Sequence, residues 1–319
     1  MNYILITDTH FGVKQNSMTW LKSQMRFFNE QLIPYIKQYN KDEVRIIHLG
    51  DVFDSRSTIS TYVASQVRSI FQQLTSLVDK LIIIAGNHDY YSPNSDEVDT
   101  LSLIFESIPN VLLVNKESYI DGENMYIPWY QWNHQEELQK TVDTLSIKNI
   151  FTHTDIVSQK ININRCDIYS GHIHIPYIKG RIRNLGSCYA LNFSDANTPR
   201  GFYVLKNNKL SFIENNQSIK FHRLYNDDIF KCNLSNFGVF DYIELYINQN
   251  NLSKENYIIR INDFMKNFKY IWVIPQSTIL ENSNEIKFEG YDIATIAKEL
   301  IPEDLQDKFN IIINSVNQE

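Results

Sequence analysis

The chain opens with an apolar run, Tyr3-Ile4-Leu5-Ile6-Thr7, which leads directly into Asp8-Thr9-His10. A short run of this kind, rich in isoleucine and bounded by polar residues, predicts a buried β-strand. Similar runs predict strands over residues 44–49, 80–85, 111–114, 125–127, 149–152 and 167–170, with helical patterns between the early ones. The alternation of strands with helices is typical of an α/β fold.

Polar motifs follow these predicted strands, each just past the carboxyl end. They are Asp8-Thr9-His10, Gly50-Asp51-Val52-Phe53-Asp54, Gly86-Asn87-His88-Asp89, His153 and Gly171-His172-Ile173-His174. Open α/β sheets bind ligands at the carboxyl ends of their strands, so we expect these motifs to meet at one site. Any one of them alone is weak, but five in order at strand ends indicate a binuclear metal site.

The residue types in these motifs suit a pair of divalent metal ions. Seven side chains offer oxygen or nitrogen ligands, which is enough for two ions sharing a carboxylate: Asp8, His10, Asp51, Asn87, His153, His172 and His174. This mixture favours Mn²⁺, with Mg²⁺, Fe²⁺ or Zn²⁺ as alternatives, and is poor for Ca²⁺. Two ions roughly 3.5–4 Å apart would clamp a phosphate for in-line displacement. His88 could then protonate the leaving group and Asp54 could orient His88.

Other patterns predict the organisation of the chain. A helical stripe, which indicates either a core-facing side or a dimer contact, comprises Ile59, Val63, Val67, Ile70, Phe71, Leu74 and Leu77. Residues 183–224 suggest a β-meander with a turn at Asn207-Asn208. After a composition break at 225–228, strands near 240–247 and 270–274, a helix near 254–268, and then a weak strand and helices predict a second, small α+β domain. The expected domains are residues 1–225 and 226–319.

Net charge and cysteine usage exclude some functions. The formal net charge of −7 argues against nucleic-acid binding by bulk electrostatics, so any DNA contact requires local basic surface, metal or a partner. Cys166, Cys188 and Cys232 are too few and too scattered for a disulfide framework. The chain shows neither a signal peptide nor a membrane-spanning run, and we expect it in the cytoplasm. His48 lies inside a strand and is expected in the core, whereas His134 and His222 are expected at the surface.

The ordered motifs resemble those of the calcineurin-like metallophosphoesterases. Within this superfamily, Asp8-Thr9-His10-Phe11-Gly12, Asn184-Leu185-Gly186-Ser187 and Thr198-Pro199-Arg200-Gly201-Phe202 resemble the SbcD branch of double-strand-break repair nucleases, and most closely its phage recombination members. The resemblance covers roughly residues 1–215. It implies a four-layer αββα sandwich with a small C-terminal α+β capping domain.

The resemblance also implies roles for individual residues. Asp8, His10, Asp51 and His174 would hold the first ion, and Asp51, Asn87, His153 and His172 the second. His88 would be the acid that contacts the phosphate. An aspartate at Asp54 departs from relatives that carry a second catalytic histidine there. Basic candidates for phosphate contact, each with a solvated surface charge as the alternative, are Lys179, Arg181, Arg183 and Arg200.

The partners that the resemblance implies are DNA, a coiled-coil ATPase of the SbcC type and a second copy of the chain. The dimer contact would use helices near 58–77 and 95–107, and the last helix, near 302–313, would dock on the ATPase. The implied activity is Mn²⁺-dependent 3′–5′ exonuclease action on duplex DNA, with endonuclease action on single strands or hairpins. Two alternatives stay open: a phosphodiesterase or phosphatase acting on nucleotides or phosphoproteins, and a non-catalytic scaffold of the same fold.

Overall fold

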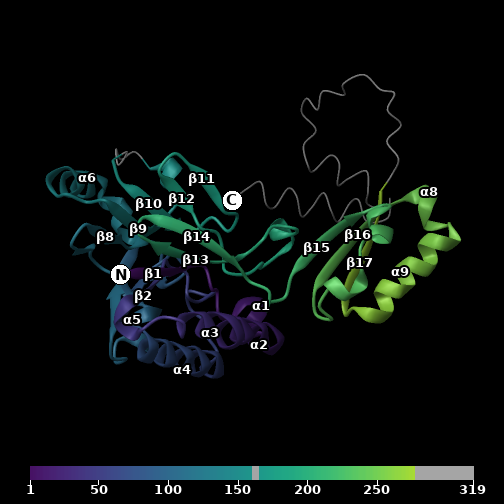
Figure 1. Ribbon diagram of the computed structural model, residues 1–319, viewed down its shortest axis with the longest axis horizontal. Helices are drawn as coiled ribbons and strands as arrows, with labels where there is room; N and C mark the ends of the chain where they lie inside the picture. The colour runs from purple at the N-terminus through teal and green to yellow at the C-terminus, as the bar shows by residue number, and fades with distance from the viewer. Residues whose placement is uncertain (160–164, 277–319) are drawn as a thin grey trace, which may run out of the picture. The chain divides into compact units, whose positions relative to one another are not determined.

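The computed structural model describes residues 1–159 and 165–276 of the chain (Figure 1). These residues belong to one compact unit, Met1–Gln276. The predicted strand and helices beyond 276, including the helix near 302–313, lie outside the described residues. In the part of the chain that is described, no helix combines the length and apolar character needed to cross a membrane.

Two six-stranded sheets form the body of the fold. The first has the order β14-β13-β1-β2-β3-β6 and comprises β1 (Asn2–Ile6), β2 (Val44–His48), β3 (Lys80–Ile84), β6 (Val111–Val114), β13 (Gly201–Lys206) and β14 (Lys209–Glu214). The second has the order β11-β12-β10-β9-β8-β7 and comprises β7 (Tyr119–Asp121), β8 (Asn124–Ile127), β9 (Asn149–His153), β10 (Asp167–Gly171), β11 (Tyr177–Lys179) and β12 (Ile182–Asn184). The central strands of each sheet run parallel, so their carboxyl ends share one edge.

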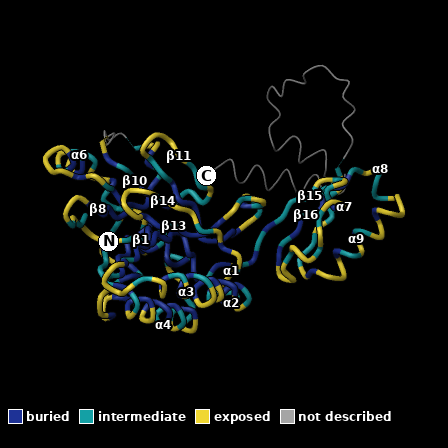
Figure 2. The backbone as a smooth tube through the Cα atoms, in the orientation of Figure 1, coloured by how far each residue is buried: buried dark blue, intermediate teal, exposed yellow. Residues whose placement is uncertain are grey.

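Alternating side chains divide each strand between two hydrophobic layers. Leu5 of β1 faces the core between the sheets, where it joins Ile47, Phe151 and Tyr169. Ile4 and Ile6 face the opposite way, towards the helices. This arrangement confirms the predicted four-layer αββα sandwich, and Figure 2 shows its buried strands beneath more exposed helices.

Helices cover the outer face of each sheet. The first sheet packs against α2 (Met18–Arg26), α3 (Ile33–Ile36), α4 (Thr61–Leu77) and α5 (Thr100–Phe105), with the short α1 (Val13–Asn16) and the π-helical turn η1 (Phe27–Leu32) in the same region. The second sheet packs against α6 (Gln135–Thr144). The 3₁₀ turns are η2 (Lys41–Glu43), η3 (Trp129–His134), η4 (Ile156–Ser158), η5 (Phe193–Asp195) and η6 (Leu234–Asn236).

The predicted helical stripe on α4 faces the core. Val63, Val67, Ile70, Phe71 and Leu74 are buried, and Ile59 and Leu77 pack against the same cluster. The turn at Asn207-Asn208 is confirmed between β13 and β14, with positive φ values of 50° and 59°. Cys166, Cys188 and Cys232 are free thiols, as expected.

A third sheet of parallel strands follows the sandwich. It comprises β15 (Phe221–Tyr225), β16 (Tyr242–Asn248) and β17 (Tyr270–Gln276), joined by α7 (Asp228–Lys231), α8 (Gln249–Leu252) and α9 (Glu255–Asn267). Ile243, Leu245 and Ile247 pack against apolar residues of α9. This α+β arrangement agrees with the predicted elements near 240–274. The predicted domain boundary at 225/226 stays a prediction, and β15, which pairs with β16, lies just before it.

Three local predictions were wrong. Residues 183–224 do not form one meander, because β12, β13–β14 and β15 belong to three different sheets. The helix expected near 95–107 begins only at Thr100, since β5 (Ser95–Asp99) pairs with β4 (Tyr90–Ser92) before it. His134 is exposed as predicted, but His222 is largely buried, with a side chain 17% exposed and a ring that contacts the Asp241 carboxylate at 3.0 Å.

Candidate metal centre

The structure brings together all seven side chains that the sequence nominated as metal ligands. Asp8 and His10 follow β1, Asp51 follows β2 and Asn87 follows β3, all in the first sheet. His153 ends β9, and His172 and His174 follow β10, all in the second sheet. The two sheets therefore deliver their ligand candidates to a common edge.

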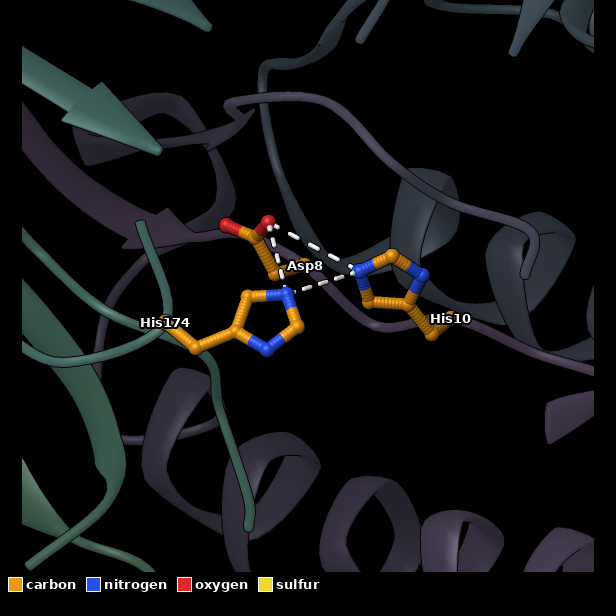
Figure 3. A group of neighbouring side chains, drawn as sticks. All are labelled: Asp8, His10 and His174. Carbon is orange, nitrogen blue, oxygen red and sulfur yellow. Dashed lines mark hydrogen bonds and ion pairs between the residues drawn. The ribbon is translucent and has the colours of Figure 1, made fainter. Parts of the chain in front are cut away.

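One group consists of Asp8, His10 and His174 (Figure 3). The Asp8 Oδ1 atom lies 3.7 Å from Nε2 of His10 and 3.7 Å from Nε2 of His174. The two imidazole Nε2 atoms are 3.2 Å apart. These three atoms converge on one point, as ligands of a single ion must.

A second group consists of Asp51, His153 and His172. The Oδ2 atom of Asp51 is 3.3 Å from His153 Nε2. The Asn87 Oδ1 atom lies 3.1 Å from His153 Nε2 and 2.9 Å from His172 Nδ1, so the amide oxygen faces this group. The set offers oxygen and nitrogen atoms in the mixture expected from the sequence.

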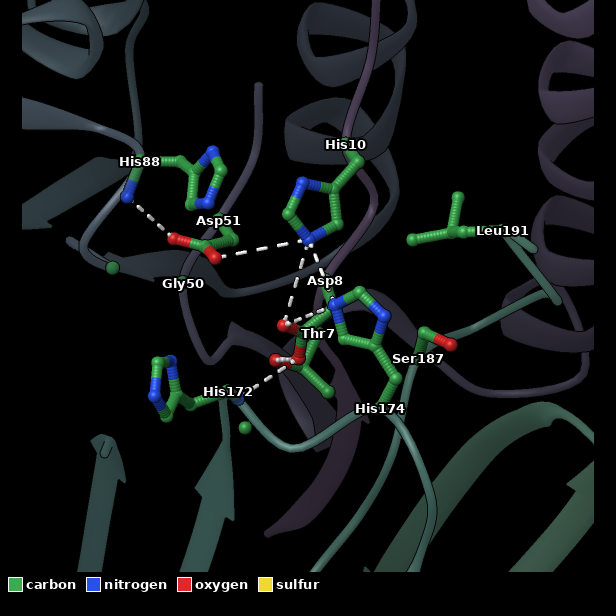
Figure 4. A network of polar contacts seen from close by, with 12 residues as sticks. Thr7, Asp8, His10, Gly50, Asp51, His88, His172, His174, Ser187 and Leu191 are labelled. Carbon is green, nitrogen blue, oxygen red and sulfur yellow. Dashed lines mark hydrogen bonds and ion pairs between the residues drawn. The ribbon is translucent and has the colours of Figure 1, made fainter. Parts of the chain in front are cut away.

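Asp51 lies between the two groups (Figure 4). Its Oδ2 atom is 3.7 Å from His10 Nε2 in the first group and 3.3 Å from His153 Nε2 in the second. Its other oxygen accepts a hydrogen bond from the backbone N–H of His88 at 2.8 Å. The Asp51 carboxylate is thus placed to be shared by two ions.

The electrostatics of the site fit bound cations. The buried Asp8 Oδ1 atom has no hydrogen-bond partner among the described residues, which is costly for a carboxylate unless a cation satisfies it. Burial alone would raise the pKa of Asp8, but His153 and His10 lower it to about 2. Burial would lower the pKa of His153, yet the Asp51 and Asp8 carboxylates raise it to about 9.

The backbone at the site is held in an uncommon conformation. Asp8, His10, Asp51 and His172 have positive φ values of 51°, 40°, 53° and 81°. Non-glycine residues adopt this region rarely, and such strain persists only where surrounding structure imposes it. The ligand loops are therefore shaped for the site at a cost in local backbone energy.

Two glycines let the loops approach closely. A Cβ atom at Gly86 would collide with the Asp51 carboxylate, and one at Gly171 would collide with Thr7 and Asp8. Both positions lie within the predicted motifs, and glycine permits the close approach because it has no Cβ atom.

Asp89, the last residue of the motif after β3, is a buried support for the ligand loops. Its buried carboxylate accepts backbone N–H groups of Asp51 at 2.9 Å, Val52 at 3.0 Å and Gly86 at 2.9 Å. It thereby joins the loops after β2 and β3. Burial and the charge of Asp51 raise the pKa of Asp89 to about 7, while the backbone donors oppose that shift.

Gln24 of α2 is a supporting residue that sequence reasoning missed. Its amide donates to the carbonyl oxygens of Thr9 at 2.9 Å and His10 at 3.3 Å, which fixes the loop after β1. Nothing in its helical surroundings distinguishes it from a surface glutamine, so only the fold reveals it. Thr7 donates to Asp8 Oδ2 at 2.6 Å and is likewise a support for a ligand.

The expected pairing of Asp54 with His88 is corrected in its details. His88 Nδ1 contacts the backbone carbonyl of Asp54 at 2.5 Å, not its carboxylate. The Asp54 carboxylate faces His10, with Oδ1 3.5 Å from Nδ1. Asp54 therefore orients His88 through the main chain, and its side chain acts on the first group instead. The His88 ring lies 5.1 Å from the His10 ring.

Lys179 is exposed, and the other three basic candidates pair with carboxylates of the protein. Arg181 and Arg183 each contact the Asp167 carboxylate at 3.0 Å. Arg200 is buried and pairs with Asp195 at 2.8 Å. The Arg200 guanidinium is committed to a carboxylate in the interior, so it is not the solvated surface charge that was the alternative to phosphate contact. His48 is a core histidine as predicted, with Nε2 2.9 Å from the Thr9 hydroxyl.

Comparisons with known proteins agree with this geometry. A family model described as calcineurin-like phosphoesterase matches residues 1–176. The chain is similar to exonuclease subunit 1 of Enterobacteria phage T4, with 25% identity over 234 residues that make up 68% of each chain. It is also similar to the manganese-dependent ADP-ribose/CDP-alcohol diphosphatase of Xenopus laevis, with 24% identity over 94 residues, 28% of this chain and 26% of that one.

Among solved structures, a protein of unknown function from Aquifex aeolicus matches 52% of this chain and 87% of its own, at 17% identity and a TM-score of 0.30. Agreement at that level is too low to bear on function.

Proposed function

The chain belongs to the calcineurin-like phosphoesterase family, and from this premise we propose that it is the nuclease subunit of a DNA-end-processing complex. Family membership and the two ligand groups make it a metal-dependent hydrolase. The finer proposal is Mn²⁺-dependent 3′–5′ exonuclease action on duplex DNA, with endonuclease action on single strands or hairpins. The observation that carries it is a pair of ligand groups with Asp51 Oδ2 3.7 Å from His10 and 3.3 Å from His153, in a chain similar over 234 residues to a phage exonuclease subunit.

We propose a role for each residue of the site. Asp8, His10, Asp51 and His174 would hold one ion, and Asp51, Asn87, His153 and His172 the other. When bound, two such ions neutralise charge on a phosphate and lower the pKa of water. His88 would donate a proton to the departing oxygen, and its Nδ1 contact with the Asp54 carbonyl leaves Nε2 free to face substrate. Asp89 and Gln24 would keep the ligand loops in place.

A homodimer is part of the proposal. Large apolar side chains are exposed around α4, the β4–β5 hairpin and α5: Leu103 is 78% exposed, Tyr91 64%, Val98 54% and Tyr62 51%. Exposed apolar side chains gathered in this way favour a protein contact. The hairpin follows His88 and Asp89 directly, so a second copy there would adjoin the site. Leu103→Asp, examined by analytical ultracentrifugation, should yield monomers if this surface is the contact.

We also propose a coiled-coil ATPase of the SbcC type as partner, with the cytoplasm, or that of the host for a phage protein, as its location. The net charge of −7 supports this proposal, because a negatively charged chain is repelled by DNA phosphates and needs a partner to bind DNA.

A second candidate function keeps the chemistry and changes the substrate. The similarity to a diphosphatase over 94 residues favours a phosphodiesterase or phosphatase acting on nucleotides or phosphoproteins. A non-catalytic scaffold is disfavoured, because six of the ligand candidates form two groups that could each hold a metal ion.

The proposal is tested by incubating the chain with Mn²⁺ and end-labelled duplex, single-stranded or hairpin DNA. A nucleoside diphosphate ester is assayed in parallel as a small-molecule substrate. We expect cleavage of DNA, and a loss of about 10²–10⁴-fold in His88→Ala with unchanged Mn²⁺ stoichiometry. Cleavage of the small ester alone would favour the second candidate. If neither is cleaved, even with the ATPase present, the enzymatic proposal is wrong.

A further inference from the structure

His174 is the least enclosed member of the first ligand group. Its side chain is 28% exposed, whereas that of His10 is 4% exposed and that of Asp8 is fully buried. It lies in the loop between β10 and β11, where the backbone has left the sheet. Among the described residues, the imidazole makes polar contacts only with His10 and Asp8, which are its fellow ligands. The position of the His174 ring is therefore set by the backbone of its loop.

That backbone is fixed from one side by three residues. Asn184 donates its amide to the carbonyl oxygens of Ile173 at 2.6 Å and Ile175 at 3.1 Å. The carbonyl of His174 itself accepts the N–H of Ser187 at 3.1 Å and an Nη1–H of Arg200. The hydrogen bonds at this short loop thus converge on the ligand residue.

Arg200 is itself rigidly placed. Its side chain is only 4% exposed, and its other terminal nitrogen donates to Asp195 Oδ1 at 2.8 Å. The second oxygen of Asp195 accepts the N–H of Leu191 at 2.8 Å, so the carboxylate is held as well. A guanidinium fork can donate to a carbonyl and a carboxylate at once, whereas an ammonium on a flexible stem does so poorly.

We propose that Arg200 is a positioning residue for the first metal group, acting through the carbonyl of His174. This inference rests on the proposed function, since it requires Asp8, His10 and His174 to bind an ion. Arg200 makes no contact with the second group, where His153 Nδ1 instead donates to the carbonyl of Leu49 at 2.7 Å. Its influence should therefore be confined to one of two metal sites.

Mn²⁺ titration of the full chain, followed by calorimetry and by the electron paramagnetic resonance of free Mn²⁺, tests this. In Arg200→Lys we expect one site to keep its parent affinity and the other to weaken by about 10–100-fold, the range for residues that orient metal ligands. The matched control is Arg45→Lys. Arg45 also bonds to two partners, Asp79 and Asp121, but it lies at the amino end of β2, away from the ligands that follow the carboxyl end. Both sites should be unchanged in that control.

A double-mutant cycle separates positioning from a general structural effect. Once His174→Ala has removed the ligand, adding Arg200→Lys should cause no further loss of Mn²⁺ affinity. Equal weakening of both sites, parent-like binding at both, or additive losses would overturn the inference.

Asn184→Ala tests the same loop without disturbing the buried ion pair, in case Arg200→Lys does not fold. Selective weakening of one site is expected, and parent-like binding would count against the inference. A parent chain that binds no Mn²⁺ would instead overturn the proposed function itself.

Discussion

The two ligand groups contain the same residue types, one aspartate and two histidines, yet the protein holds them differently. In the second group, His153 is fully buried and its Nδ1 has a backbone partner at 2.7 Å. In the first group, Nδ1 of His10 has no hydrogen-bond partner among the described residues and only a 3.5 Å ion-pair contact with Asp54, Oδ1 of Asp8 has no hydrogen-bond partner there either, and His174 is partly exposed. Ligating histidines are usually oriented by a hydrogen bond at the other ring nitrogen. His153 is therefore pre-organised by its backbone partner, whereas, in the described part of the chain, the first group has no ring nitrogen held by a backbone carbonyl.

Asp51→Asn should have the largest effect, because it removes charge from both groups at once. We expect Mn²⁺ stoichiometry to fall below one per chain and hydrolysis to slow by about a thousandfold or more, since metal ions supply several kcal/mol of transition-state stabilisation. Elemental analysis and initial rates measure the two effects. Asp143→Asn, at an exposed ion pair, is the control. Retention of both ions in Asp51→Asn would show that the carboxylate is not shared.

His172→Ala and His174→Ala should distinguish the groups. Each removes one imidazole, so each should weaken one Mn²⁺ site by about 10–100-fold and leave the other. In the parent chain, competition with a chelator should empty the first site before the second, because His153 of the second site is buried and pre-organised. Loss of both ions together at a single chelator concentration would contradict the comparison.

Asp89→Asn tests how far the second group depends on its support. An amide cannot accept all the backbone N–H groups that the carboxylate accepts, so buried donors lose their partner. We expect a loss of about 2 kcal/mol in the free energy of unfolding, measured with urea in saturating Mn²⁺. Asp143→Asn again serves as control. An unchanged midpoint would mean that the loops after β2 and β3 hold their shape without Asp89.

His48 offers the most specific test, because it lies beneath the site without belonging to either group, and its effect at any pH above 6.5 is expected to be small. Burial lowers its pKa to about 3, far below the ordinary value near 6.5. The unfolded chain therefore binds a proton between these values that the folded chain does not, and stability falls as pH drops through this range. His48→Gln should reduce the slope of unfolding free energy against pH, between pH 6 and 4, by about 1.4 kcal/mol per pH unit. A slope equal to that of the parent would show that His48 is protonated in the fold.

The sequence was sufficient to place the ligands but not their supports. Asp8, Asp51 and His153 could be predicted because each follows a short apolar strand, and parallel strands bring their carboxyl ends together. Arg200 could not be predicted as a buried residue, since a basic side chain carries no periodic signal and its partner Asp195 is identified only by the fold. Asp54 was placed beside His88 correctly, but sequence cannot tell a carboxylate contact from a carbonyl contact. The polar segment 95–99 formed a strand through pairing with β4, where local propensity indicated helix.

Each ligand group draws residues from both sheets, and this has a mechanical consequence. Asp8 and His10 extend from the first sheet to meet His174 from the second, and Asp51 meets His153 and His172 in the same way. An ion bound by either group would cross-link two sheets that are otherwise held together by apolar side chains. The thickness of the layer formed by Leu5, Ile47, Phe151 and Tyr169 sets the spacing of the two sheets, and so the distance between the ligands on either side. Repacking that layer would alter catalysis from the interior, without touching a ligand.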